Sequence, residues 1–245
     1  MICKGWQMER HEMRRNIWLW NAAQSLLIVA FIFDALVISQ EPNQNLPQAN
    51  LEDGYQPLFD NESLKGWEGN RDWFRVEDGA VVAGSLTRPI PHNEFLCTER
   101  QYTNFELRLE ARLKGSGDNA GVQFRTLRIP DSTEVSGYQC DIGSAWNRPV
   151  WGGLYDESRR NKMLAEGDPK VVVGALKTGD WNELMVRAVD NHIQIWLNRS
   201  LTVEFTETDP KIAKSGVIAL QIHSGPPTEA WYRNIRIREL PSSQR

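Results

Sequence analysis

The segment from Gly137 to Arg160 is dense in side chains that could do chemistry, and it reads GYQCDIGSAWNRPVWGGLYDESRR. Its first residues alternate in polarity, which predicts a strand with Tyr138, Cys140 and Ile142 on the buried face. A passage rich in Trp, Gly and Pro follows. The segment ends in a cluster of titratable and hydrogen-bonding types, namely Tyr155, Asp156, Glu157, Arg159 and Arg160. A core strand needs no such cluster, so we interpret it as a site for a polyhydroxylated, partly charged ligand.

Polar residues also share one alternating phase in three separate predicted strands. These residues are Gln123 and Arg125, Gln139 and Asp141, and Gln221 and His223. If the strands are neighbours, the period-2 rule places all six side chains on one concave sheet face. We expect Glu157, Arg159 and Arg160 to converge on this face from the following loop, with Trp151 and Tyr155 as further ligand contacts. An ordinary solvated face is the alternative, and a lone His at a strand end is often only a structural hydrogen-bonding group.

Several standard chemistries are not predicted. The sequence has no Gly-x-Ser-x-Gly elbow, no phosphate-binding GxxxxGK[ST] loop and no cysteine spacing typical of a zinc site. A glycosidase that acts directly on the glycosidic bond needs two carboxyl groups, ~5 Å apart in retaining enzymes. Asp141 has no carboxylate at its same-phase neighbours, which are Gln139 and Gly143. The formal net charge of -4 also argues against nucleic acid as a partner.

The elements that must position these residues are short strands. From Tyr55 to Leu240 the sequence shows about a dozen strands at regular spacing, which is typical of a two-sheet antiparallel sandwich or jelly roll. Asp78-Gly79 is the favoured two-residue turn of a hairpin. Residues 104–114 alternate cleanly, as expected for a strand with one wet face. We expect one short helix, near residues 159–164.

The first 39 residues combine basic residues, a long apolar run and a small residue, Ser39, before Gln40. This pattern predicts a signal peptide cleaved near Ser39, with a retained membrane anchor as the alternative. Residues 40–53 form a polar linker and 54–241 the folded domain. We therefore expect an exported protein that is free of the membrane once the leader is removed. Cys97 and Cys140 then remain, and we expect both to be unpaired.

The domain resembles a known family over residues 54–240. The resemblance is carried by LFDNESLKGW, WFRVEDGAVVAG, NFELRLEARL, NAGVQFR, GYQCDIG, WGGLYDESRRNKML and YRNIRIREL. The family is the 3-keto-disaccharide hydrolase domain family, which has a concanavalin A-like lectin/glucanase fold. The resemblance implies an all-β, two-sheet antiparallel jelly-roll sandwich. It also implies an oligosaccharide or glycoside substrate that is already oxidised at C3, and therefore an upstream sugar 3-dehydrogenase.

A ketone at C3 acidifies the proton on C2, so that a base can remove it and the C1 substituent can leave by elimination; water then adds back. On this resemblance, His223, Asp141 and Glu157 are the candidates for the base and the acid. Arg125, Arg159 and Gln123 are the candidate donors to the enolate oxygen. A divalent cation on Asp141, Glu157 and His223 would serve the same purpose. The alternative function is a non-catalytic carbohydrate-binding module that stacks sugar on Trp67, Trp146 or Trp151.

Overall fold

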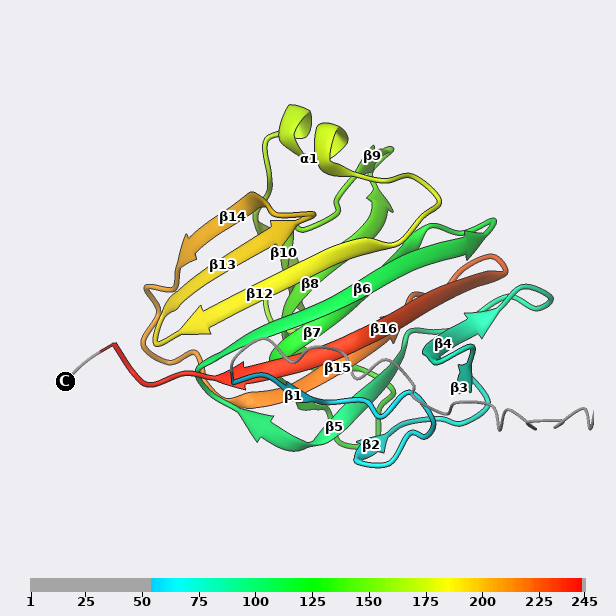
Figure 1. Ribbon diagram of the computed structural model, residues 1–245, viewed down its shortest axis with the longest axis horizontal. Helices are drawn as coiled ribbons and strands as arrows, with labels where there is room; N and C mark the ends of the chain where they lie inside the picture. The colour runs from blue at the N-terminus through cyan, green and yellow to red at the C-terminus, as the bar shows by residue number, and fades with distance from the viewer. Residues whose placement is uncertain (1–53, 244–245) are drawn as a thin grey trace, which may run out of the picture. The chain divides into compact units, whose positions relative to one another are not determined.

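Alternating apolar residues give the strands one buried and one outer face, and two antiparallel sheets pack these buried faces together. The computed structural model describes residues 54–243, and Figure 1 shows one sheet in front of the other. We call the sheets the β6 sheet and the β8 sheet after a central strand of each. Each contains eight strands within the described residues. The predicted two-sheet jelly roll is confirmed.

The β6 sheet has the order β14-β13-β12-β6-β16-β4-β3, and β1 pairs with β16. Its strands are β1 (Gln56–Pro57), β3 (Phe74–Glu77), β4 (Ala80–Ser85), β6 (Phe105–Gly115), β12 (Asn182–Val189), β13 (His192–Leu197), β14 (Ser200–Thr206) and β16 (Thr228–Glu239). The predicted turn between β3 and β4 is present, with positive φ at Asp78 and Gly79. The strand predicted over 104–114 is β6, and its Phe105, Leu107 and Leu109 are buried in the core.

The β8 sheet carries the predicted site and has the order β11-β10-β8-β7-β15-β5-β2, while β9 pairs with β8. Its strands are β2 (Trp67–Glu68), β5 (Glu94–Tyr102), β7 (Asn119–Arg128), β8 (Val135–Ala145), β9 (Arg148–Pro149), β10 (Leu154–Glu157), β11 (Lys162–Ala165) and β15 (Gly216–Ile222). Tyr138, Cys140 and Ile142 of β8 point into the core, as predicted.

The helix expected near residues 159–164 is wrong, because that stretch forms a turn followed by β11. The chain instead forms α1 at Pro169–Ala175, next to β9 in Figure 1. Asp168 caps the helix, since its carboxylate accepts a hydrogen bond from the backbone N–H of Lys170 at 2.8 Å. Pro169 follows at the first helical position, where proline is favoured. This Asp-Pro pair is the local signal that marks the helix.

Both cysteines in the described range are free and buried, so the prediction that they are unpaired is confirmed. They lie on opposite faces of the β8 sheet. Cys140 belongs to the core between the sheets, whereas Cys97 packs with Phe95 and Ala219 on the outer face. The sheet itself therefore separates the two thiols.

The predicted signal peptide (1–39) and linker (40–53) lie outside the described residues. Within residues 54–243, no helix is both long and apolar enough to cross a membrane.

Candidate functional site

Three neighbouring strands place polar side chains together on the outer face of the β8 sheet. In the strand register Gln123 of β7 lies opposite Gln139 of β8, and Gln139 lies opposite Tyr155 of β10. Asp141 follows Gln139 in the same phase. Gln221 of β15 lies opposite Gly121 of β7, and Gly121 in turn lies opposite Asp141 of β8. The predicted shared face is therefore present for these residues, while their chemical roles remain predictions.

A row of hydrogen bonds links the side chains of Gln123, Gln139 and Asp141. Gln123 Nε2 donates to Gln139 Oε1, and Gln139 Nε2 donates to Asp141 Oδ1 at 2.6 Å. All three side chains are buried. Gly121 provides the space for this row, because a Cβ atom at this position would lie 2.4 Å from Gln139 Cδ. The row thus depends on a glycine on the adjacent strand.

We expect Gly121→Ala to displace Gln139 and to break its hydrogen bond to Asp141. The new methyl group overlaps a flexible side chain, so the fold should survive while turnover of a 3-keto-glucoside falls by about 10-fold, the scale of one lost hydrogen bond to a charged group. The measurement is kcat beside the thermal unfolding midpoint. Gly174→Ala is the matched control, because a Cβ at that helical position meets nothing within 4 Å. If the Gly121 variant and the wild type are equally active, activity does not depend on the space that Gly121 leaves for Gln139.

Asp141 is only 6% exposed, and its environment favours the protonated form more than water does. Burial raises the pKa of Asp141 to about 7, and the negative charges of Glu157 and Glu166 act in the same direction. The hydrogen bond from Gln139 opposes this shift, because it stabilises the carboxylate. A carboxyl group with a pKa near neutral pH can exchange a proton during a reaction.

Glu157 is a second carboxyl group on the same face whose pKa is raised. Burial raises the pKa of Glu157 to about 7, with a further contribution from Glu134, while hydrogen bonds from Gln221 and the Ser158 backbone oppose the shift. Gln221 Nε2 lies 3.5 Å from Glu157 Oε2. β7 and β8 separate the strands of these two residues, so the contact is possible only if the outer face curves inward. This contact supports the predicted concave surface.

The two carboxyl groups come from distant positions along the strands. Glu157 lies opposite Gly137, four residues before Asp141 on β8. At ~3.3 Å per residue their Cα atoms are offset by about 13 Å along the strand direction. The side chains shorten this offset, because the Glu157 carboxyl group reaches Gln221, which lies at the level of Asp141 in the strand register.

The backbone under this face is held from across the core. The hydroxyl group of Tyr232, on β16 of the opposite sheet, donates a hydrogen bond to the carbonyl oxygen of Gln221 at 2.6 Å. It also lies 3.2 Å from the carbonyl oxygen of Gly121. Tyr232 therefore fixes β7 and β15 at the level of Gln221.

His223 follows β15 directly and is half-buried. Its Nδ1 lies 2.7 Å from the carbonyl oxygen of Ser224. A carbonyl group can only accept, so Nδ1 carries the proton and Nε2 of the neutral ring is the basic nitrogen. Among the described residues no hydrogen bond joins the His223 ring to Asp141 or Glu157. Its catalytic role remains a prediction.

The expected position of Arg125 on the outer face is wrong. The register of β7 against β8 shifts between Phe124 and Leu127, and Arg125 has a φ of 48° at this bulge. Its guanidinium group instead donates to the carbonyl oxygens of Thr103 and Asp190, at 2.8 and 2.7 Å, and to Asn104 Oδ1 at 3.1 Å. A bulge inserts one residue and reverses the phase of the strand beyond it. Burial lowers the pKa of Arg125 to about 10.

Arg159 and Arg160 also do not reach the outer face. Both pair with Asp156, which lies opposite the core residue Tyr138 and is fully buried. The Arg159 Nε–Asp156 Oδ1 distance is 2.8 Å, and the Arg159 guanidinium lies 4.5 Å from the centre of the Tyr138 ring. Arg160 also binds Glu207 at 2.8 Å. These arginines stabilise the inner side of β10, opposite to Glu157.

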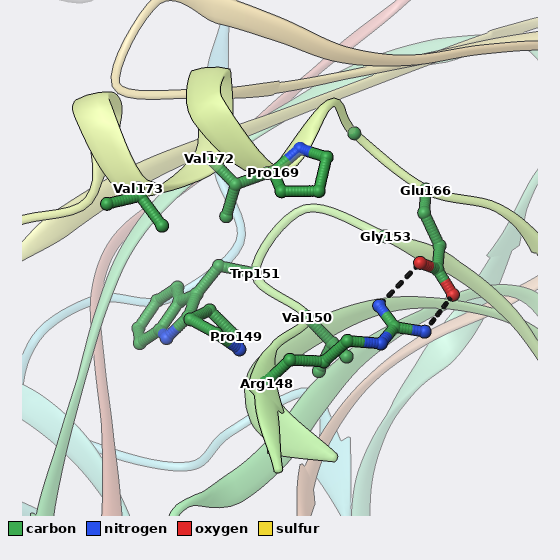
Figure 2. A pocket seen from close by; sticks show the side chains of 10 residues that line it. Arg148, Pro149, Val150, Trp151, Gly153, Glu166, Pro169, Val172 and Val173 are labelled. Carbon is green, nitrogen blue, oxygen red and sulfur yellow. Dashed lines mark hydrogen bonds and ion pairs between the residues drawn. The ribbon is translucent and has the colours of Figure 1, made fainter. Parts of the chain in front are cut away.

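Trp151 is buried too, and the expectation that it contacts the ligand is not supported by its placement. It packs among core residues that include Val172 of α1 and lines a cavity of about 50 Å³ (Figure 2). At the rim of this cavity Figure 2 shows the ion pair of Arg148 and Glu166, with an Nη2–Oε1 distance of 2.6 Å. Of the three tryptophans proposed as sugar platforms, Trp67 is also buried, whereas Trp146 is 64% exposed.

Residues 54–243 contain no group of three or more His, Cys, Asp or Glu side chains placed to hold a metal ion. Asp141, Glu157 and His223 are thus not gathered as a ligand set. The divalent cation remains a prediction from the sequence.

Comparison with known structures places this sheet geometry in a wide group of sandwich proteins. A provisionally named glycosyl hydrolase from Parabacteroides distasonis matches with a TM-score of 0.58 and 23% identity, covering 76% of this chain and 99% of its own. A galectin-like protein from Bacillus subtilis matches with a TM-score of 0.55 and 12% identity, over 76% and 94%. The carbohydrate-binding module CBM66 from Bacillus subtilis matches with a TM-score of 0.51 and 12% identity, over 71% and 96%. At these identities the matches establish the fold alone.

The sequence decides the family. Residues 54–238 match the 3-keto-alpha-glucoside-1,2-lyase-like domain. The chain belongs to this family. No curated protein is similar enough in sequence to count as a relative. Membership places this lyase-like domain among glycoside-cleaving, carbohydrate-acting proteins, and the resemblance noted in the sequence is confirmed.

Proposed function

We propose that this lyase-like domain cleaves 3-keto-glycosides on the outer face of the β8 sheet. The observation that carries the proposal is Asp141, a buried carboxyl group on that face with a pKa raised to about 7 and a hydrogen bond from Gln139. A single base near neutral pH is what removal of the C2 proton requires. The family membership supports the same reaction.

The reaction proceeds by elimination and addition. Asp141 takes the proton from C2, and the electron pair of the C2–H bond forms an enolate with the C3 ketone. The enolate then expels the oxygen substituent at C1, so that C1 and C2 become doubly bonded. Protonated Glu157 gives its proton to the leaving oxygen. Water adds at C1 and a proton returns to C2, which gives net hydrolysis.

Stabilisation of the enolate requires a donor near the C3 oxygen. Arg125 and Arg159 are directed elsewhere, so they do not fill this role. Tyr155 is half-buried on the same face, opposite Gln139, and its hydroxyl group is the donor that we assign. Burial raises the pKa of Tyr155, which keeps the hydroxyl protonated and able to donate. The substrate must come from an enzyme that oxidises a glycoside at C3.

The proposed function is tested with a 3-keto-glucoside and its unoxidised parent. Turnover of the 3-keto-glucoside alone is the expected result. The competing function is a carbohydrate-binding module, which the exposed ring of Trp146 favours. Binding of the parent glycoside without turnover of either sugar, together with loss of that binding in Trp146→Ala, would establish the module instead.

We expect a bell-shaped pH dependence of kcat/KM with its maximum close to pH 7. The pKa values of Asp141 and Glu157 are both raised to about 7. The base must be ionised, so activity falls below this pH; the acid must be protonated, so activity falls above it. Glu157→Gln should remove the alkaline limb if Glu157 is the acid. Loss of the acidic limb in that variant would show that the two roles are exchanged.

A further inference from the structure

Two buried hydrogen-bond acceptors without partners lie close together on the outer face of the β8 sheet. They are Gln123 Oε1 and Gln221 Oε1, and neither has a partner among the described residues. Their strands, β7 and β15, are neighbours, and the two residues are diagonal to each other: Gln123 lies opposite Ala219, and Gln221 opposite Gly121. Buried polar groups without partners are rare in folded proteins, so two on one face require an explanation.

Carboxylates fix the orientation of both amide groups. A carboxylate can only accept hydrogen bonds, so Asp141 holds the NH₂ group of Gln139. Gln139 Oε1 then accepts from the NH₂ group of Gln123, which directs Gln123 Oε1 away from the row. In the same way, the ionised form of Glu157 accepts from the NH₂ group of Gln221, and the oxygen of Gln221 is left without a donor. The missing partners must therefore be donors.

The contact between Glu157 and Gln221 explains why these oxygens are covered. It spans β7 and β8, so it passes over the outward side chains of Gln123 and Gln139. Its length of 3.5 Å is at the limit for a hydrogen bond. A ligand that binds to this face can displace such a weak contact and uncover the two oxygens.

We propose that Gln123 and Gln221 recognise two hydroxyl groups of the bound sugar, which donate to the two amide oxygens after displacing the Glu157–Gln221 contact. The proposal rests on the proposed function, because it takes this face as the sugar site. A ketone has no hydrogen to donate, so C3 of a 3-keto-glycoside is not held by this pair. Gln123 is thus an acceptor for unoxidised hydroxyl groups, and not the enolate donor expected from the sequence.

The test measures binding of methyl glucoside and its monodeoxy analogues to the full chain by isothermal titration calorimetry. For the wild type we expect two of the analogues to bind ~3- to 10-fold more weakly, the effect of one neutral hydrogen bond each. Gln123→Met should abolish the discrimination at one hydroxyl position and Gln221→Met at the other. Gln101→Met, an exposed glutamine on β5 of the same sheet, should change neither.

The proposal is overturned if the two methionine variants discriminate among the analogues as the wild type does, or if the wild type binds all analogues equally or none. A crystal structure of the wild type with bound methyl glucoside gives a readout that needs no variant. If water or protein groups, and not the sugar, donate to both Gln123 Oε1 and Gln221 Oε1 in that structure, the proposal is also overturned. The proposed function is tested separately. If the wild type discriminates among the analogues but does not turn over a 3-keto-glucoside, recognition of two hydroxyl groups is supported and the catalytic proposal is contradicted. Turnover without discrimination supports the catalytic proposal and contradicts the recognition of the hydroxyl groups.

Discussion

Asp141→Asn lowers kcat for a 3-keto-glucoside at pH 7 by ~100-fold or more, because the amide cannot take the C2 proton. The substitution keeps the size of the side chain and an oxygen that can accept the hydrogen bond from Gln139. The fold should therefore be preserved. The measurement is steady-state turnover together with the thermal unfolding midpoint, so that loss of chemistry is separated from loss of structure.

Asp131→Asn is the matched control for this substitution, since Asp131 is exposed in the loop between β7 and β8. It should leave kcat unchanged. His223→Ala identifies the competing base, because His223 Nε2 is the other basic group near the end of β15. Full activity of Asp141→Asn, combined with ~100-fold loss in His223→Ala, would assign proton removal to His223.

Asp156→Ala lowers the free energy of unfolding by ~3 kcal/mol, because it leaves Arg159 without its buried anion and Arg160 with Glu207 as its remaining partner. Asp156 is fully buried and pairs with Arg159 and Arg160. We take the low end of the range for buried ion pairs because these two arginine side chains keep 20% and 25% of their surface exposed. Urea unfolding followed by tryptophan fluorescence measures the change.

Glu239→Ala provides the comparison with an exposed ion pair. Glu239 pairs with Arg100 at the surface, where solvent screens the two charges and such pairs contribute little to stability. A loss in Asp156→Ala no larger than the loss in Glu239→Ala would show that the Asp156 cluster does not stabilise the inner side of β10.

The sequence by itself determined the strands and, where a strand is regular, the face of each side chain. Hydrophobic residues that recur at every second position must share one face, because successive side chains of a strand point in opposite directions. This rule placed Tyr138 and Cys140 in the core, and therefore Gln139 and Asp141 outside. Asp78-Gly79 identified a hairpin through its tolerance of positive φ. The family motifs also predicted the jelly-roll architecture.

Only the tertiary structure decided which strands are neighbours and where the alternation breaks. A bulge depends on pairing with the adjacent strand, and one inserted residue reverses every later side chain; for this reason Arg125 faces away from the site. Asp156 turns Arg159 and Arg160 inward because a buried carboxylate must be paired. The raised pKa of Asp141 and the contact between Glu157 and Gln221 also arise from residues far apart in the chain, since burial and curvature are properties of the assembled sheet.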